Sequence, residues 1–124
     1  MRFTEDTADA SYVIDAYGPG WVSINHVAYT HSVIVMPDQL HTPWRPTHLT
    51  EFTADDLGKI LAMTPEIILV GTGRHQRFPE TDILKQLAAE SIGCEFMDTA
   101  AACRTYTVLM AEKRRVAAAL LMAD

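Results

Sequence analysis

The sequence lacks most of the features that would assign a chain of 124 residues to a specialised class. No apolar run approaches the roughly 18 residues that cross a bilayer, and the acidic start, Met1–Asp6, has no apolar core of a secretory signal. Only two cysteines are present, Cys94 and Cys103, and without an export signal we expect both as reduced thiols. We therefore expect a cytoplasmic protein that does not insert directly into a membrane.

Basic charge is also scarce, because the chain has a net charge of −6. Residues 1–66 carry nine acidic and three basic side chains, whereas residues 67–124 carry seven of each. Proteins that bind nucleic acids or anionic membranes usually carry a basic patch on their surface. The charge distribution therefore argues against nucleic acid as a partner and against docking on an anionic membrane.

Several catalytic and metal-binding patterns are missing. The five histidines form no helical His-x-x-x-His pair and no Cys-x-x-Cys is present, so we expect no metal ion. There is no Gly-x-Ser-x-Gly sequence of a serine hydrolase, and the acids show no distinctive pairing. The sequence therefore offers no candidate catalytic residue and no cofactor site. Whether the protein is an enzyme stays open, and the missing patterns favour a protein that is not one.

The first half of the chain has the pattern of β-structure. Residues 12–17 and 21–24 are predicted strands joined by a turn at Gly18-Pro19-Gly20, where the glycines permit positive φ and the proline fixes its own. A further strand is predicted over 29–36, and the proline-rich segment 38–46 is predicted as a surface loop.

The second half alternates between helices and strands. Thr53 is a predicted cap of a helix that places Leu57 and Ile60 on one face. Helices over 79–91 and from Thr99 to about Glu112 follow, with Ile83, Leu84, Leu87 and Ala88 inward and Gly93 ending the first of them; strands are predicted over 67–70, 94–97 and 116–122. The last of these could instead extend the preceding helix, although a buried strand is preferred.

This order predicts an α/β fold. We expect one three-layer domain over residues 1–124, with a mixed central sheet and helices packed on it. The N-terminal hairpins supply extra strands or a second small sheet.

Two loops follow predicted neighbouring strands and could form a site. Gly71–Arg74 follow one strand, and Asp98 with Thr99 opens the helix after the other. Ligands of open α/β sheets bind where strands end, and free amides near glycines and helix starts favour an anion. A small anionic-ligand pocket is one hypothesis, and a turn that only packs closely is the other. The candidate residues are Gly71, Thr72, Gly73, Arg74, Asp98, Thr99, Cys103, Arg104 and Tyr106.

Arg104 and Cys103 each allow two interpretations. Arg104 lies among small and apolar residues, so it is either a structural ion pair, with Asp98, Glu112 or an N-terminal acid, or a ligand contact. Cys103 lies near a helix start, where the dipole can lower the pKa of a thiol, but a small buried side chain is the favoured role.

Three segments together resemble a known family. They are Pro65-Glu66-Ile67-Ile68-Leu69-Val70-Gly71-Thr72-Gly73, Met97-Asp98-Thr99-Ala100-Ala101-Ala102-Cys103-Arg104-Thr105-Tyr106 and Glu112-Lys113-Arg114-Arg115-Val116-Ala117-Ala118-Ala119-Leu120-Leu121. The family includes the NADH dehydrogenase 1 alpha subcomplex assembly factor 3, the adipogenesis-associated domain protein and many bacterial proteins of unknown function. The resemblance implies a three-layer α/β fold, without an established enzymatic activity or cofactor. Thr107 departs from the pattern, because many members carry asparagine there.

Two functions follow as hypotheses. The resemblance favours a non-enzymatic interaction or assembly module that binds another protein or an assembly complex near membrane respiratory complexes. The alternative is a binder of a small anion, or an enzyme, that uses the Gly71–Arg74 loop and Arg104.

Overall fold

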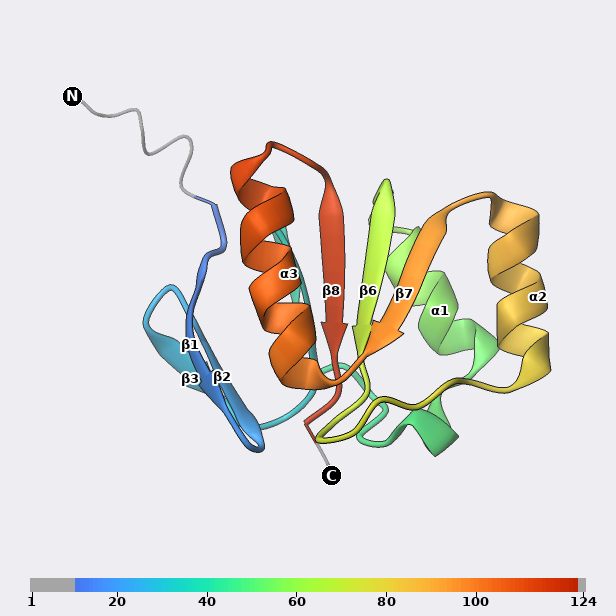
Figure 1. Cartoon of the computed structure of the whole chain (residues 1–124), viewed down its shortest axis with the longest axis horizontal. Coiled ribbons are helices and arrows are strands. Elements are labelled where there is room, and N and C mark those ends of the chain that lie inside the picture. Colours follow the sequence, from blue (N-terminus) through green and yellow to red (C-terminus); the bar gives the residue numbers. More distant parts are fainter. Residues whose placement is uncertain (1–10, 123–124) are drawn as a thin grey trace.

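The structure of the chain is a computed structural model that describes residues 11–122, and it places helices on both sides of a central sheet (Figure 1). The strands are β1 (Ile14–Gly18), β2 (Trp21–Ile24), β3 (Val27–Tyr29), β4 (Val33–Met36), β5 (Gln39–His41), β6 (Ile67–Gly71), β7 (Gly93–Met97) and β8 (Val116–Leu120); the helices are η2 (Leu49–Glu51, a 3-10 turn), α1 (Ala54–Leu61), α2 (Thr81–Glu90) and α3 (Thr99–Ala111).

The central sheet is mixed, as predicted, with the strand order β5-β4-β8-β6-β7. β6 runs parallel to both β7 and β8, whereas β4 is antiparallel to β8 and to β5. The predicted final strand is confirmed as β8, and its five side chains are completely buried at the centre of the sheet. Its three successive alanines are short, so the layers on both faces can approach closely.

Two hydrophobic cores lie on opposite faces of this sheet. Alternate β8 residues Ala117 and Ala119 face one core, together with α1 and α2, while Ala118 and Leu120 face the other, together with α3. The second core also receives apolar side chains from the small antiparallel sheet β1-β2-β3. Figure 1 shows this small sheet beside α3, as the predicted N-terminal addition to a three-layer fold.

Two predicted elements in the first half differ from the structure. The strand expected over 29–36 is two strands, β3 and β4, which belong to different sheets, and the chain crosses between them at 30–32. The buried Ser32 fixes this crossing because its carbonyl accepts from the Trp44 amide at 2.7 Å. The segment 38–46 is not only a loop, because it contains the edge strand β5.

The predicted helix over 79–91 also needs correction. Of the four residues expected inward, Ile83 and Leu87 are buried, but Leu84 and Ala88 are exposed. Ser91, with φ of 57°, forms the left-handed end of α2, while Gly93 already begins β7. The apolar face is therefore narrower than the sequence suggests, because α2 lies over the margin of the sheet.

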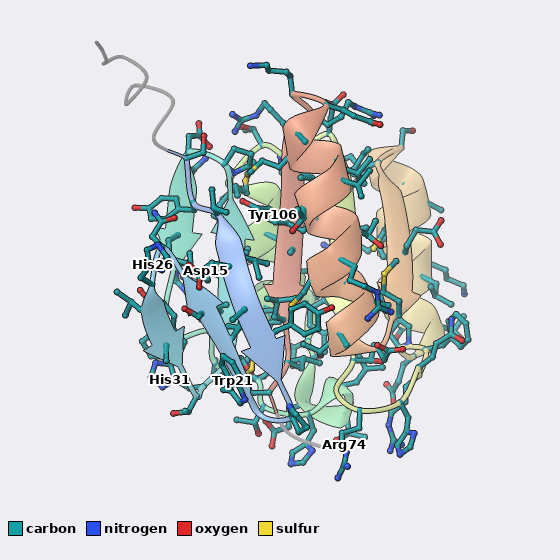
Figure 2. The ribbon with its side chains drawn as sticks, turned by 60° about the vertical axis from the view of Figure 1, so that its left-hand side comes forward. Asp15, Trp21, His26, His31, Arg74 and Tyr106 are labelled. Atoms are coloured by element: carbon teal, nitrogen blue, oxygen red, sulfur yellow. The ribbon has the colours of Figure 1, made fainter. Side chains whose placement is uncertain are left out.

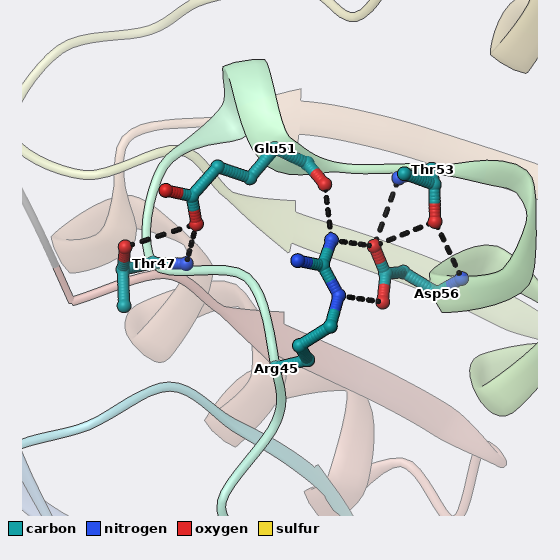
Figure 3. Close-up of polar contacts among 5 residues, drawn as sticks. All are labelled: Arg45, Thr47, Glu51, Thr53 and Asp56. Carbon is teal, nitrogen blue, oxygen red and sulfur yellow. Dashed lines mark hydrogen bonds and ion pairs between the residues drawn. The ribbon is translucent and has the colours of Figure 1, made fainter.

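The start of α1 is fixed by the predicted threonine cap and by an arginine that the sequence pattern does not reveal (Figure 3). The amide of Thr53 donates to the Asp56 carboxylate at 2.9 Å, and the Thr53 hydroxyl accepts from the Asp56 amide at 3.3 Å. Arg45 donates to both carboxylate oxygens of Asp56, at 3.1 and 2.6 Å, and to the carbonyl of Glu51. This network holds the loop before α1 against the helix.

Candidate functional site

The two candidate loops emerge side by side, as the sequence predicts. β6 and β7 are parallel neighbours with Gly71 opposite Met97, so both strands end at the same edge of the sheet. The amide of Thr72 extends the pairing by donating to the carbonyl of Met97 at 2.8 Å. The carboxyl end of β8 is there too, because Leu120 lies opposite Gly71 on the other side.

Thr99 connects these three strand ends. Its hydroxyl accepts from the Gly73 amide at 2.9 Å and donates to the carbonyl of Leu121 at 2.8 Å. Its own amide donates to the carbonyl of Gly73 at 2.8 Å. We call Gly73, Thr99 and Leu121, with these three hydrogen bonds, the Thr99 junction. It joins the segment after β6, the start of α3 and the end of β8.

Gly71 is required by the same junction. A Cβ atom at this position would lie 2.9 Å from Oγ1 and 3.0 Å from Cα of Thr99. Gly73 has a φ of 100°, a conformation that other residues rarely adopt. Gly71 therefore permits the close contact with Thr99, and Gly73 permits the turn that follows β6.

Thr72 and Asp98 stabilise the two loops internally. The Thr72 hydroxyl is buried, donates to the carbonyl of His75 at 2.6 Å and accepts from the Arg77 amide at 3.2 Å. The Asp98 carboxylate caps α3 by accepting from the Ala101 amide at 2.8 Å. The cap places a negative charge at the helix start, which opposes binding of an anion there.

A small pocket of about 190 Å³ opens beside the junction. Gly73, Arg74, Asp98 and Thr99 line it, so four of the nine candidate residues meet there. Its other wall is the β1–β2 turn, and its remaining lining residues are Gly18, Pro19, Gly20, Ala100, Leu121 and Met122. Figure 2 shows Arg74 at the same end of the molecule as this turn. The turn could be predicted from the sequence, but its position against α3 could not.

Cys103 and Tyr106 lie in the core behind the pocket. Cys103 is fully buried, and burial raises the pKa of its thiol to about 12, so it stays protonated at neutral pH. The favoured interpretation as a small core side chain fits this position, and the nucleophile interpretation does not. Tyr106, which is labelled in Figure 2, is also fully buried, and burial raises its pKa. Its hydroxyl donates to the carbonyl of Tyr12 at 2.7 Å, which ties α3 to the segment before β1.

Arg104 belongs neither to the hydrophobic cores nor to the lining of the pocket. It is exposed, and Nη1 donates to the hydroxyl of Tyr17 on β1 at 3.4 Å. Within residues 11–122 the structure gives it no ion pair with Asp98 or Glu112, while the N-terminal acids Glu5, Asp6 and Asp9 lie outside the described residues. Thr107, beside it on α3, directs its hydroxyl to a carbonyl of its own helix. Arg104 thus links α3 to the small sheet.

The family described as "Protein of unknown function (DUF498/DUF598)" matches residues 14–121. The chain belongs to this family. The match spans all the strands and helices described above, and the resemblance drawn from the three sequence segments is confirmed. The description of DUF498/DUF598 names no activity.

Three similar proteins illustrate the range of the DUF498/DUF598 relatives. The "13 kDa major membrane protein" of Francisella tularensis is 31% identical over 122 residues, which cover 98% of this chain and 99% of that protein. "NADH dehydrogenase [ubiquinone] 1 alpha subcomplex assembly factor 3" of Danio rerio is 29% identical, covering 98% of this chain and 70% of that protein. An NMR structure from Xanthomonas campestris has 37% identity and a TM-score of 0.85, covering 98% of this chain and 92% of that chain.

The names of these DUF498/DUF598 relatives bear on the predicted location. One is called a membrane protein. In the described part of this chain, residues 11–122, none of the helices has the length and apolar character needed to span a bilayer. The cytoplasmic location stays a prediction.

Proposed function

We propose that this chain is a protein-interaction module that takes part in the assembly of a larger complex. The proposal rests on one observation: relatives named as assembly factors of NADH dehydrogenase align with nearly its whole length. The Danio rerio protein aligns over 98% of the chain. Assembly of a membrane respiratory complex is accordingly the first process in which to look for its partner.

Two features of the structure support this proposal. The residues of the family pattern serve internal contacts, since Thr99 forms a junction and Cys103 is buried. In contrast, large apolar side chains are exposed, including Phe78 and Leu84, which line one common groove. Apolar residues that gather in one place on a surface are typical of protein-binding sites.

Purification from the organism that makes the chain tests the proposal. The tagged chain is produced at its natural level and isolated under mild conditions, and the proteins that accompany it are quantified by mass spectrometry. We expect one partner in near-equal amount, and a subunit of NADH dehydrogenase would support the specific process. Repeated isolation of the chain with no partner in comparable amount would count against an interaction module.

Binding of a small anion is the second candidate function, and the pocket beside the Thr99 junction is the observation that favours it. Arg74 supplies a positive side chain and Gly73 lies beside it, while the volume of about 190 Å³ suits a ligand of only a few atoms. The Asp98 carboxylate at the helix start counts against this candidate.

A thermal-shift series distinguishes the second candidate. Phosphate, sulfate, acetate and pyruvate are the probes, and an anion at 100 times its dissociation constant stabilises the fold by about 2.7 kcal/mol. Arg74→Gln should remove this stabilisation if Arg74 holds the anion. Unchanged melting temperatures with all four anions would refute the anion site and leave the interaction module untouched.

A further inference from the structure

A second hollow lies between α2 and β7, away from the Thr99 junction. It has a volume of about 440 Å³. Its walls are the α2 residues Leu84, Leu87, Ala88 and the following Ser91 and Ile92, the β7 residues Cys94, Glu95 and Phe96, and the loop residues Gln76 and Phe78. We call it the α2–β7 groove. Figure 1 shows α2 beyond the outer side of β7, so the groove follows the margin of the central sheet.

β7 presents an open edge to this groove. In the described part of the chain it is the last strand of the sheet and pairs only with β6. The carbonyl of Met97 accepts from Thr72 on the β6 side, and backbone direction alternates along a parallel strand. The amides and carbonyls of Cys94 and Phe96 therefore point outward. The carbonyl of Phe96 accepts from Nε2 of Gln76 at 3.0 Å, which confirms that direction.

The groove is apolar on the α2 side of the sheet. Cys94 and Phe96 face α2, where Phe96 belongs to the core and Cys94 packs against it. Phe78 is 67% exposed and Leu84 is 43% exposed, although both are large and apolar. The ring of Phe78 lies 6.5 Å from that of Phe96, so an exposed aromatic side chain continues the buried one outward. An extended segment lying beside β7 would cover both rings.

The negative charge of Glu95 determines which kind of segment can pair with β7. Glu95 is the only charged residue among those lining the groove, and strand alternation directs it to the α3 side, opposite to Phe96. In a second copy paired antiparallel over all of β7, Glu95 would lie directly opposite Glu95. Like charges at such positions are destabilising. A lysine or arginine from a different protein would complement Glu95 instead.

We propose that β7 accepts an extended segment of a partner protein as an added strand, with apolar residues facing α2 and a basic residue opposite Glu95. The inference rests on the proposed interaction function and names its contact surface. Backbone hydrogen bonds to Cys94 and to the amide of Phe96 supply affinity, since the Phe96 carbonyl already accepts from Gln76. The alternation of apolar and basic residues supplies selectivity.

A synthetic peptide tests this directly. The probe is acetylated and amidated Ile-Lys-Ile-Lys-Ile-Lys-Ile, compared with its Glu-for-Lys analogue and with a peptide of the same composition in blocked order. Binding is followed by backbone amide NMR. We expect the alternating lysine peptide to bind most tightly, to shift the amides of Cys94 and Phe96 and to slow their hydrogen exchange. Glu95→Lys should reverse the preference toward the glutamate peptide.

Two variants at position 94 distinguish the contribution of the backbone hydrogen bond to peptide binding from that of the side chain. Cys94→Pro removes an outward amide that the sheet does not use, and proline is tolerated at such edge positions. Cys94→Val also removes the thiol but keeps the amide. We expect peptide binding to fall about tenfold or more in Cys94→Pro and to be kept in Cys94→Val.

A second matched pair covers the case in which proline disturbs folding. Phe78→Ser removes an exposed apolar group from the groove, whereas Val108→Ser removes a group that is 57% exposed on α3. We expect the first to weaken binding of the lysine peptide and the second to leave it unchanged.

Other results overturn the inference. These are absence of binding to the wild-type chain, equal binding to Cys94→Pro and Cys94→Val, or a dimer in sedimentation that Cys94→Pro abolishes. If a natural partner purifies equally with Cys94→Pro and Cys94→Val, the edge-strand inference fails and the interaction function stands. If the peptide binds as expected but no natural partner purifies, the interaction function fails instead.

Discussion

Replacing Thr99 by valine tests whether the family's sequence pattern serves the fold. Valine has nearly the same shape as threonine but lacks the hydroxyl that bridges the Gly73 amide, at 2.9 Å, and the Leu121 carbonyl, at 2.8 Å. The hydrogen bond from the amide of residue 99 to the carbonyl of Gly73 is retained, because it uses the backbone. The substitution therefore removes only the side-chain half of the Thr99 junction.

The expected loss of stability follows from these two bonds. Gly73 and Leu121 are both buried, so the Gly73 amide and the Leu121 carbonyl lose a partner that water cannot easily replace. One unsatisfied buried group costs about 1–3 kcal/mol, and we expect about 2–4 kcal/mol for the pair. Threonine and valine have similar helix propensities, so the start of α3 adds little to this value.

Urea unfolding followed by circular dichroism measures the effect. The free energy of unfolding of Thr99→Val should fall by the amount given, whereas Thr99→Ser, which keeps the hydroxyl, should lose about 1 kcal/mol or less. The melting temperature of the valine variant should fall by roughly 10 °C. A valine variant within about 0.5 kcal/mol of wild type would refute the structural role assigned to the hydroxyl.

Three further predictions concern single positions. Gly71→Ala should lower the free energy of unfolding by about 1–3 kcal/mol, since the added methyl group overlaps the start of α3; an unchanged urea midpoint would contradict this. Cys103 should react with iodoacetamide at pH 8 far more slowly in the native than in the unfolded chain, because its pKa is raised to about 12 and it is buried; peptide mapping measures both rates, and equal rates would exclude a buried thiol. Burial alone would raise the pKa of Asp56, but the hydrogen bonds from Arg45 and the helix cap outweigh it and hold the pKa below 3.8. The ionised carboxylate therefore stabilises the fold above the unfolded-state pKa, and this contribution disappears as the pH falls through the lower folded-state value. Asp56→Asn should be less stable than wild type by about 1–2 kcal/mol at pH 7, and the gap should shrink by pH 3; a constant gap would be the contrary result.

Local patterns in the sequence predict much of this fold for clear physical reasons. Glycine at Gly18 and Gly20 marks the hairpin turn, and Thr53 marks the start of α1. The succession of strand, helix and strand around Ile67–Gly71 predicts parallel neighbours, because such connections return to the same sheet with a fixed hand. The two candidate loops meet because β6 and β7 are such neighbours, with Gly71 opposite Met97.

The remaining features depend on contacts between distant segments. Small residues surround Arg104 on α3, so the helix has no marked apolar face, and the packing of β1 determines that this side chain is exposed. The crossing at Ser32 depends on Trp44, twelve residues later in the chain. The pocket wall at Pro19 depends likewise on where the small sheet packs. None of these contacts has a local sequence signal.

Photo-crosslinking in cells tests most directly whether this chain works by holding another protein. Benzoylphenylalanine replaces Phe78 in the α2–β7 groove or, as the comparison, Val108 on α3, and adducts are separated by mass after irradiation. The account predicts one discrete adduct with a single protein from position 78 and little from position 108. Absence of any adduct at position 78, or the same mixture from both positions, would contradict it.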